Sequence, residues 1–320
     1  MPLRGPPIAI FAYRRPDHVR RLLESLARNP EFATSPTFIY CDAARSPRDE
    51  AAVAATREVV HRHAPATAEI IARATNLGLS RSIIDGVTTL CDRYGSVIVL
   101  EDDLVVSPVV LAYFRQALEH YAGDEQVMHV SGYVFPTASP LPDAFFYRVT
   151  SCWGWATWAR AWRHFQANSL WLRREIVHRH LVRRFEVDGA FPYLQMLDDQ
   201  ITGRNDSWAI RWYASVLLRG GLCLHPGRSL VVNEGFDSTG EHCGVSDVYA
   251  TLLADRVPTT FPEGFTEDPR ALDQLREYFG STVFGGGRRG SLPRRWNRAV
   301  RQWLRRLPVR IKSEVFGRRP

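Results

Sequence analysis

The sequence has few of the signals that mark disulfide-rich, zinc-stapled or membrane-spanning proteins. Its five cysteines are widely scattered and form no Cys-x-x-Cys pair, which argues against a disulfide framework and a structural zinc site. The apolar run at residues 8–12 is too short for the core of a signal peptide, and no other run approaches bilayer-crossing length. We therefore expect a cytoplasmic protein, with 320 residues available to build a substantial core.

The glycine-rich phosphate loops of many nucleotide-binding proteins are also missing. No Gly-x-Gly-x-x-Gly follows the first apolar segment and no Walker lysine motif occurs, so neither dinucleotide nor P-loop binding is supported. Lysine itself is nearly absent, because Lys312 is the only one in the chain. If this protein binds phosphate groups, arginine side chains and a metal ion must balance their charge.

Positive charge is concentrated at the C-terminus. The net charge is +7, but residues 288–320 hold 12 basic residues against one acid, so the remainder carries −4 and gives no reason to expect a specific nucleic acid partner. After a linker at residues 285–287, an apolar stripe with two tryptophans faces an arginine-rich side, which is typical of a helix lying on an anionic membrane. A partner-docking helix and non-specific RNA contact are the alternatives.

Strands and helices are expected to alternate through the first hundred residues. Apolar segments at 7–13, 37–41, 69–72 and 96–100 read as strands, and the segments between them show helical spacing. This alternation predicts a doubly wound, mostly parallel α/β sheet. Because the carboxyl ends of parallel strands meet at one edge, Arg14, Asp42 and the acids at 101–103 should converge there.

The segment from Ser96 to Leu104 is the centre of the functional hypothesis. A buried strand runs directly into Glu101, Asp102 and Asp103, and three adjacent carboxylates repel one another unless a cation or hydrogen bonds compensate them. Hard divalent cations prefer oxygen ligands, so a metal ion bridging these acids to a diphosphate is one interpretation. A solvated turn, or a cap for a helix starting near Ser107, is the other.

The second half contains several further candidate features. Helical character at 107–121 and strands at 126–131, 144–149 and 222–226 extend the α/β pattern. Trp155, Trp158 and Trp162 share helical spacing and are expected to pack inward from a helix. Trp153 and Gly154 precede that helix and are better placed to line a site, where an aromatic face can stack on a sugar ring.

Two later positions carry alternative interpretations. Asp206 lies at a helix start, where an N-cap is the simplest role, and a general base for a sugar hydroxyl is the functional one. His242 lies in a glycine-rich polar loop over residues 231–243 that could close over a ligand. It is either a surface residue or a ligand for metal or phosphate.

These segments together resemble bacterial glycosyltransferases of the family 2-like, GT-A-fold type, and more distantly the N-acetylglucosaminyltransferase that acts on the mannose core of N-glycans. The resemblance covers roughly residues 7–243 and rests on 8–14, 76–79, 97–103, 154–155, 205–212 and 233–242. It implies that Asp103 binds Mn²⁺ or Mg²⁺ and that Asp206 is the catalytic base, and His242 in the polar loop is added as a candidate second metal ligand. It also implies donor contacts from Arg14, Asp42 and Arg81. From their places at strand ends and before the tryptophan-rich segment, we expect further donor contacts from Ala12, Glu101, Asp102, Trp153 and Gly154. The strict Asp-x-Asp spacing of the family is absent here.

The resulting prediction is a metal-dependent, inverting glycosyltransferase. It would transfer a sugar from a nucleotide-sugar, with a UDP-sugar favoured, to a hydroxyl of a cell-surface glycan or lipid-linked acceptor at the inner face of the cytoplasmic membrane. Residues 1–284 would form the catalytic domain, with a nucleotide half to about 106 and an acceptor half beyond it, and residues 285–320 the membrane-binding tail. A sugar nucleotidyltransferase and a non-catalytic membrane adaptor are the alternatives.

Overall fold

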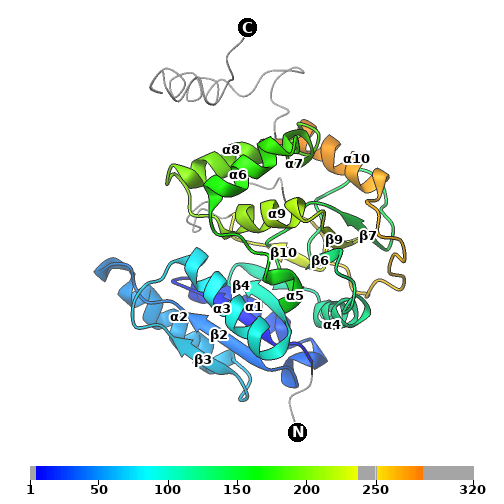
Figure 1. The fold of residues 1–320 in the computed structure, drawn as a ribbon. Coiled ribbons are helices and arrows are strands. Elements are labelled where there is room, and N and C mark those ends of the chain that lie inside the picture. The colour runs from blue at the N-terminus through cyan, green and yellow to red at the C-terminus, as the bar shows by residue number, and fades with distance from the viewer. Residues whose placement is uncertain (1–4, 237–248, 250, 284–320) are drawn as a thin grey trace.

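The computed structural model describes residues 5–236, 249 and 251–283 (Figure 1). The predicted linker and basic tail at 285–320 lie outside the described residues, and so does His242. Within the part that is described, no helix is both long and apolar enough to cross a membrane.

A central sheet of eight strands in the order β3-β2-β1-β4-β8-β6-β9-β7 forms the framework of the molecule. Strands β7 and β8 run antiparallel to their neighbours, whereas the other pairings in this sheet are parallel. A second, two-stranded sheet pairs β5 with β10. The strands are β1 (Ile8–Ala12), β2 (Thr37–Cys41), β3 (Glu69–Ala72), β4 (Ser96–Glu101), β5 (Leu104–Val106), β6 (Val127–Ser131), β7 (Ala144–Tyr147), β8 (Trp155–Trp158), β9 (Leu222–Pro226) and β10 (Val231–Asn233).

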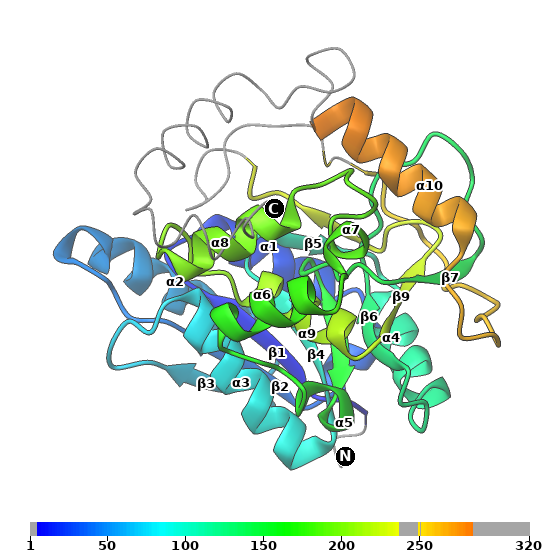
Figure 2. The same ribbon diagram turned by 45° about the horizontal axis from the view of Figure 1, so that its top comes forward.

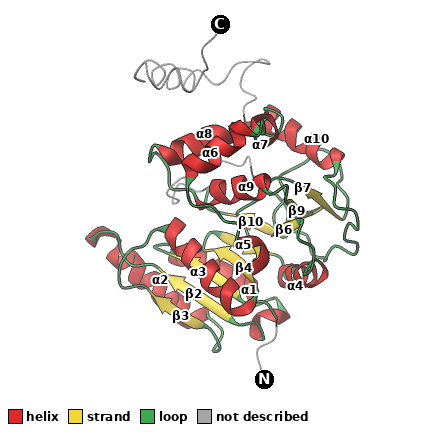
Figure 3. Cartoon of the chain, viewed as in Figure 1, coloured by secondary structure: helices red, strands yellow, loops and turns green. Residues whose placement is uncertain are grey.

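Helices cover both faces of the sheet (Figures 1 and 3). Apolar side chains of α1, α2 and α4 pack on one face, and those of α3, α5 and α9 pack on the other. The predicted mostly parallel, Rossmann-like α/β architecture is therefore confirmed. The helices are α1 (Pro16–Leu26), α2 (Glu50–His63), α3 (Leu79–Tyr94), α4 (Val110–His120), α5 (Ala159–Trp162), α6 (Ser169–His178), α7 (Val182–Phe185), α8 (Tyr193–Ile201), α9 (Trp208–Leu218) and α10 (Pro269–Tyr278), with short turns η1 (Pro30–Ala33), η2 (Pro47–Asp49) and η3 (Phe279–Val283).

The tryptophan-rich segment is a strand followed by a short helix, and the predicted single helix is wrong. Trp155 and Trp158 belong to β8, which lies between β4 and β6, and Trp162 ends α5. Because neighbouring strand residues face opposite sides, Trp155 packs in the cluster on one face of the sheet and Trp158 in the cluster on the other. All three indoles are buried, so their inward packing is confirmed.

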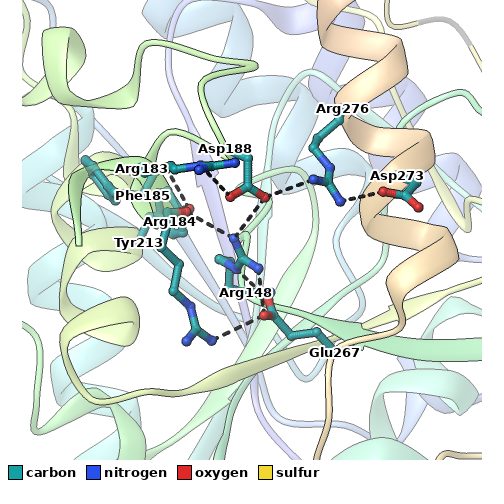
Figure 4. Close-up of polar contacts among 9 residues, drawn as sticks. All are labelled: Arg148, Arg183, Arg184, Phe185, Asp188, Tyr213, Glu267, Asp273 and Arg276. Atoms are coloured by element: carbon teal, nitrogen blue, oxygen red, sulfur yellow. Dashed lines mark hydrogen bonds and ion pairs between the residues drawn. The ribbon is translucent and has the colours of Figure 1, made fainter. Parts of the chain in front are cut away.

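A third apolar cluster joins α6, α7, α8 and α10 to β7 and to one side of α9. Figure 1 shows these helices on the far side of α9 from α1 and α2, and Figure 2 brings α6, α7 and α8 to the front of the view. A buried ion pair between Arg148, just after β7, and Glu267, just before α10, fastens the C-terminal part of this layer to the sheet (Figure 4).

Candidate active site

A cavity of about 440 Å³ opens at the carboxyl ends of β1, β2 and β4. The chain continues from β1 to β2 and β3 on one side, then returns to place β4 on the other side of β1. The strand order therefore reverses between β1 and β4, which is the position where open α/β sheets bind ligands. Residues from α8, the start of α9 and β10 complete the lining, so both halves of the chain contribute.

The acidic triplet at the end of β4 is held by the segment that follows β1. Asp102 accepts hydrogen bonds from the Tyr13 backbone N–H at 2.9 Å and from the Arg15 guanidinium at 2.5 Å. The same Arg15 nitrogen lies 3.1 Å from Oδ2 of Asp103. These acids do not cap the following helix, since α4 begins at Val110 and Val109 is its N-cap. The interpretation of the triplet as a helix cap is therefore wrong.

Two atoms of this ion-pair cluster are buried and have no hydrogen-bond partner among the residues that the structure describes. They are Oδ1 of Asp103 and Nη1 of Arg15. Buried polar groups in native proteins are nearly always hydrogen-bonded, and exceptions call for an explanation such as an absent ion or ligand. One orphan atom is an anionic acceptor and the other a cationic donor, so the two have opposite ligand preferences.

The acids also repel one another. Burial, together with the charges of Asp103 and Asp102, raises the pKa of Glu101 well above its ordinary value. Burial likewise raises the pKa of Asp103, while the positive charge of Arg15 opposes this shift. Burial alone would lower the pKa of Arg15, but the charges of Asp102 and Asp103 raise it above its ordinary value. A single guanidinium therefore leaves the triplet short of positive charge.

Asp42, at the end of β2, holds a turn on the wall of the cavity. Its carboxylate accepts backbone hydrogen bonds from Ala43, Leu77 and Gly78, each at 2.9 Å. Gly78 has a φ of +76°, a conformation that glycine adopts without strain, and it is the N-cap of α3. Asp42 thus lines the cavity while fixing the turn that leads into α3.

The other predicted donor-binding residues separate into two groups. Ala12 and Arg14 line the cavity, although Nη1 of Arg14 lies 2.8 Å from Asp49. Arg81 is exposed on α3, and neither it nor Gly154 is among the lining residues. Gly154 has a φ of +64°, and a Cβ there would lie 2.8 Å from Cγ2 of Val231, so glycine is required for packing.

Asp206 lines the cavity just before the start of α9 and is not the N-cap of that helix. Ser207 is that cap, since its side chain accepts a hydrogen bond from the Ile210 backbone N–H. One oxygen of Asp206 lies 3.1 Å from Nη2 of Arg211, a buried residue that also donates to the Ser80 hydroxyl. The Asp206 carboxylate is 63% exposed, so it remains accessible to a ligand in the cavity.

Trp153 presents an aromatic surface to the same cavity. Its ring meets those of Tyr133, Tyr249 and Phe236 edge to face, with centroids 4.6, 5.1 and 5.5 Å away. These contacts fix the orientation of the indole, and an indole held in this way suits stacking against the apolar face of a sugar. The predicted position of Trp153 at a site is consistent with this placement.

A metal ion would have to use few protein ligands here. Among the described residues, no group of three or more His, Cys, Asp or Glu side chains is arranged to hold one. Mg²⁺ bound with a nucleotide needs only one or two carboxylates, because phosphate oxygens and water complete its shell, and Mn²⁺ also favours oxygen ligands. The orphan Oδ1 of Asp103 fits such a role.

Sequence reasoning missed Arg15 and Arg211. Arg15 follows β1 by three residues, next to Arg14, which was chosen because it lies nearer the strand end. Tyr13 contacts the triplet through its backbone N–H, so the alternation of side chains along this segment gives no signal for Arg15. No local signal links Arg211 to Ser80, which is 131 residues away in the sequence.

No family model matches the sequence, and no curated protein matches it. Among solved structures, the chain is similar to a mannosyltransferase from Pyrobaculum calidifontis in complex with GDP-Man and Mn²⁺, at 12% identity over 67% of this chain and 74% of that one, with a TM-score of 0.32. It is similar to a mannose-1-phosphate geranyltransferase from Thermus thermophilus at 14% identity, 71% and 75% coverage and a TM-score of 0.33. It is also similar to mouse xyloside xylosyltransferase 1 at 10% identity, over 66% of this chain and 80% of that one, with a TM-score of 0.34. Similarity at this level leaves the function to be argued from the site itself.

Proposed function

We propose that this protein is a metal-dependent glycosyltransferase that uses a nucleotide-sugar donor and inverts the configuration at the transferred sugar. The observation that carries the proposal is the pair of orphan atoms, Oδ1 of Asp103 and Nη1 of Arg15, buried at the strand-order reversal. An acceptor and a donor within one ion-paired cluster match the two components of a metal-bound diphosphate. The family 2-like resemblance of the sequence supports the same reaction.

The triplet and its neighbours would bind the donor diphosphate. Asp103 would hold Mn²⁺ or Mg²⁺, which when bound neutralises the negative charge that develops on the departing diphosphate. Arg15 keeps the Asp103 carboxylate in place through its 3.1 Å contact. Asp42 and the turn at 76–78 would form the wall against the nucleoside, with a UDP-sugar as the favoured donor.

Asp206 and Trp153 would serve the acceptor side. Asp206 is exposed to the cavity, and as a carboxylate it can remove the proton from an acceptor hydroxyl during attack on the sugar. Arg211 orients the Asp206 carboxylate, as their 3.1 Å contact indicates. Trp153 offers its ring to a sugar. The acceptor would be a glycan or lipid-linked saccharide, reached at the membrane through residues 285–320.

The test is a survey of nucleotide-sugars with and without Mn²⁺, measuring release of the nucleoside diphosphate and transfer to glycan acceptors. The proposal requires metal-dependent release from one nucleotide family, lost in Asp103→Asn and in Asp206→Asn. Conversion of a nucleoside triphosphate and a sugar 1-phosphate into a nucleotide-sugar would assign the protein to the nucleotidyltransferases instead. Binding of none of these ligands would contradict both.

A further inference from the structure

Arg15 and Asp103 form an ion pair, and each of them also carries one of the two unpaired atoms. Nη2 of Arg15 contacts Oδ2 of Asp103 at 3.1 Å, so the two residues are paired with each other through these atoms. Oδ1 and Nη1 are buried and have no hydrogen-bond partner within the described part of the chain. The side chains are only 18% and 14% exposed, so bulk water satisfies these atoms poorly. A cation can bind at one atom and an anion at the other.

Arg15 is also fixed in place. Its 2.5 Å contact with Asp102 is backed by the Tyr13 backbone N–H, which donates to the other oxygen of Asp102. A cation that binds Oδ1 of Asp103 would therefore approach a carboxylate already carrying a guanidinium on its second oxygen. Two like charges on one carboxylate repel, and burial weakens the screening of this repulsion.

A diphosphate changes this balance. One of its negatively charged oxygens can accept a hydrogen bond from Nη1 of Arg15, and others can ligate the same cation that Asp103 binds. The guanidinium then attracts the anion instead of only repelling the cation. Each component consequently improves the site for the other.

Resting on the function proposed above, we infer that Arg15 couples the binding of the divalent ion to the binding of the diphosphate. The ion alone binds weakly because Arg15 already occupies one side of Asp103. The diphosphate alone binds weakly because the acids at 101–103 repel it. Together they bind tightly, and such coupling is reciprocal by linkage.

Arg14 is not equivalent. Its Nη1 lies 2.8 Å from Asp49 and its side chain is 38% exposed, so it is part of a different ion pair outside the triplet. The inference therefore belongs to one arginine of the adjacent pair.

The test measures binding of Mn²⁺ alone by electron paramagnetic resonance, of inorganic pyrophosphate alone in chelated buffer by calorimetry, and of both together. For Arg15→Gln we expect Mn²⁺ alone to bind at least about 5-fold tighter and pyrophosphate alone at least about 10-fold weaker, so that mutual enhancement shrinks. A general structural defect would weaken both. Arg115→Gln is the control and should match wild type, because Arg115 is exposed on α4 and lies 3.9 Å from Glu31.

Arg15→Lys provides a second variant in case the glutamine variant does not fold. It keeps the charge but lacks the planar fork, so Mn²⁺ alone should bind as in wild type while pyrophosphate binds more weakly. Equal affinities in wild type and both variants, or no pyrophosphate binding by wild type even in the presence of Mn²⁺, would overturn the inference. Loss of coupling in the variants without turnover of any nucleotide-sugar would uphold the inference while refuting glycosyl transfer. Turnover of a nucleotide-sugar together with unchanged coupling in the variants would support glycosyl transfer and refute the inference about Arg15.

Discussion

Two buried arginine–carboxylate clusters in this molecule differ in how completely they are hydrogen-bonded. Around Arg148, Nε and Nη2 contact the two oxygens of Glu267 at 2.6 and 2.8 Å, and Nη1 donates to the Arg184 carbonyl at 3.3 Å (Figure 4). Around Arg15, one nitrogen serves two acids while Nη1 and the Asp103 Oδ1 have no partner. The saturated cluster joins β7 to α10, and the unsaturated one lies in the cavity.

This difference separates residues that stabilise the fold from residues that also bind a ligand. A saturated buried ion pair can only lose interactions when it is altered, so its effect should be on stability. An unsaturated one retains capacity for a ligand, so its alteration should change binding as well. Each expectation below assigns a residue to one side of this division.

The largest effect should come from Arg148→Gln. Replacing Arg148 leaves Glu267 with only the half-exposed Arg184 as a counter-charge among the described residues, so we expect a loss of about 3 kcal/mol in the free energy of unfolding, the lower end of the range for a broken buried pair. Urea denaturation measures this, with Arg184→Gln as control. Arg184 contacts the same Glu267 but is 48% exposed, so its replacement should cost less than about 1 kcal/mol. Equal losses in the two variants would show that the full set of hydrogen bonds around Arg148 adds nothing to the free energy of unfolding.

The next largest effect concerns Asp206. Asp206→Asn should lower kcat at least about 100-fold and leave donor affinity within about 3-fold, because a general base acts in the transition state. Asp273→Asn is a matched control, since Asp273 is also an exposed carboxylate paired with an arginine, but in the saturated cluster. Parallel losses of kcat and donor affinity would reassign Asp206 to donor contact or folding.

Much of the nucleotide half followed from sequence because its signals are local. Apolar runs of 4–6 residues ended by polar side chains located β1, β2 and β4, and the triplet fell at the end of β4 as expected. β8 was missed because a central strand is buried on both faces, so Trp155 and Trp158 show no strand alternation.

The contacts inside the site could not be predicted, because they join distant positions. Arg15 meets Asp102 across 87 residues, and Asp42 meets Leu77 across 35. Sequence indicated that the triplet needed a compensating cation, but only the fold shows that an arginine supplies part of it. It also shows which oxygen remains without a partner.

His129 is a second buried group whose hydrogen bonds are all made, and its effect on stability should depend on pH. Its Nε2 lies 3.1 Å from the Ser151 carbonyl, and its Nδ1 accepts from the Trp212 indole, so the neutral ring is fully paired. Burial, followed by the nearby His225, lowers the pKa of His129 well below 6.5. The folded state therefore binds this proton less readily than the unfolded state, and stability should fall as pH drops below about 6.5.

Below pH 6.5 the expected slope approaches about 1.4 kcal/mol per pH unit for each such group. Burial also lowers the pKa of His225, to about 4, so this residue adds a second contribution. Urea unfolding between pH 7.5 and 5.5 should show a smaller slope in His129→Gln than in wild type. Identical slopes would mean that His129 titrates alike in both states.

The smallest effect should come from Gly235→Ala. A Cβ at Gly235 would lie 2.5 Å from Oδ2 of Asp103, so the carboxylate would have to shift, which would alter its contact with Arg15. We expect affinity for Mn²⁺ with pyrophosphate to fall about 3–10-fold, measured by calorimetry, because displaced ligands bind metal less well. Gly123→Ala is the control, since a Cβ there meets nothing within 4 Å. Unchanged affinity would indicate that the position of Oδ2 does not matter.

The central claim is that the unsaturated cluster binds a metal ion with a diphosphate and the saturated one does not. The most direct measurement is titration of Mn²⁺ in the presence of inorganic pyrophosphate, followed by electron paramagnetic resonance. Wild type and Glu267→Gln should each bind one ion tightly, and Asp103→Asn should bind none. Tight binding that survives in Asp103→Asn, or that is lost in a folded Glu267→Gln variant, would contradict this account.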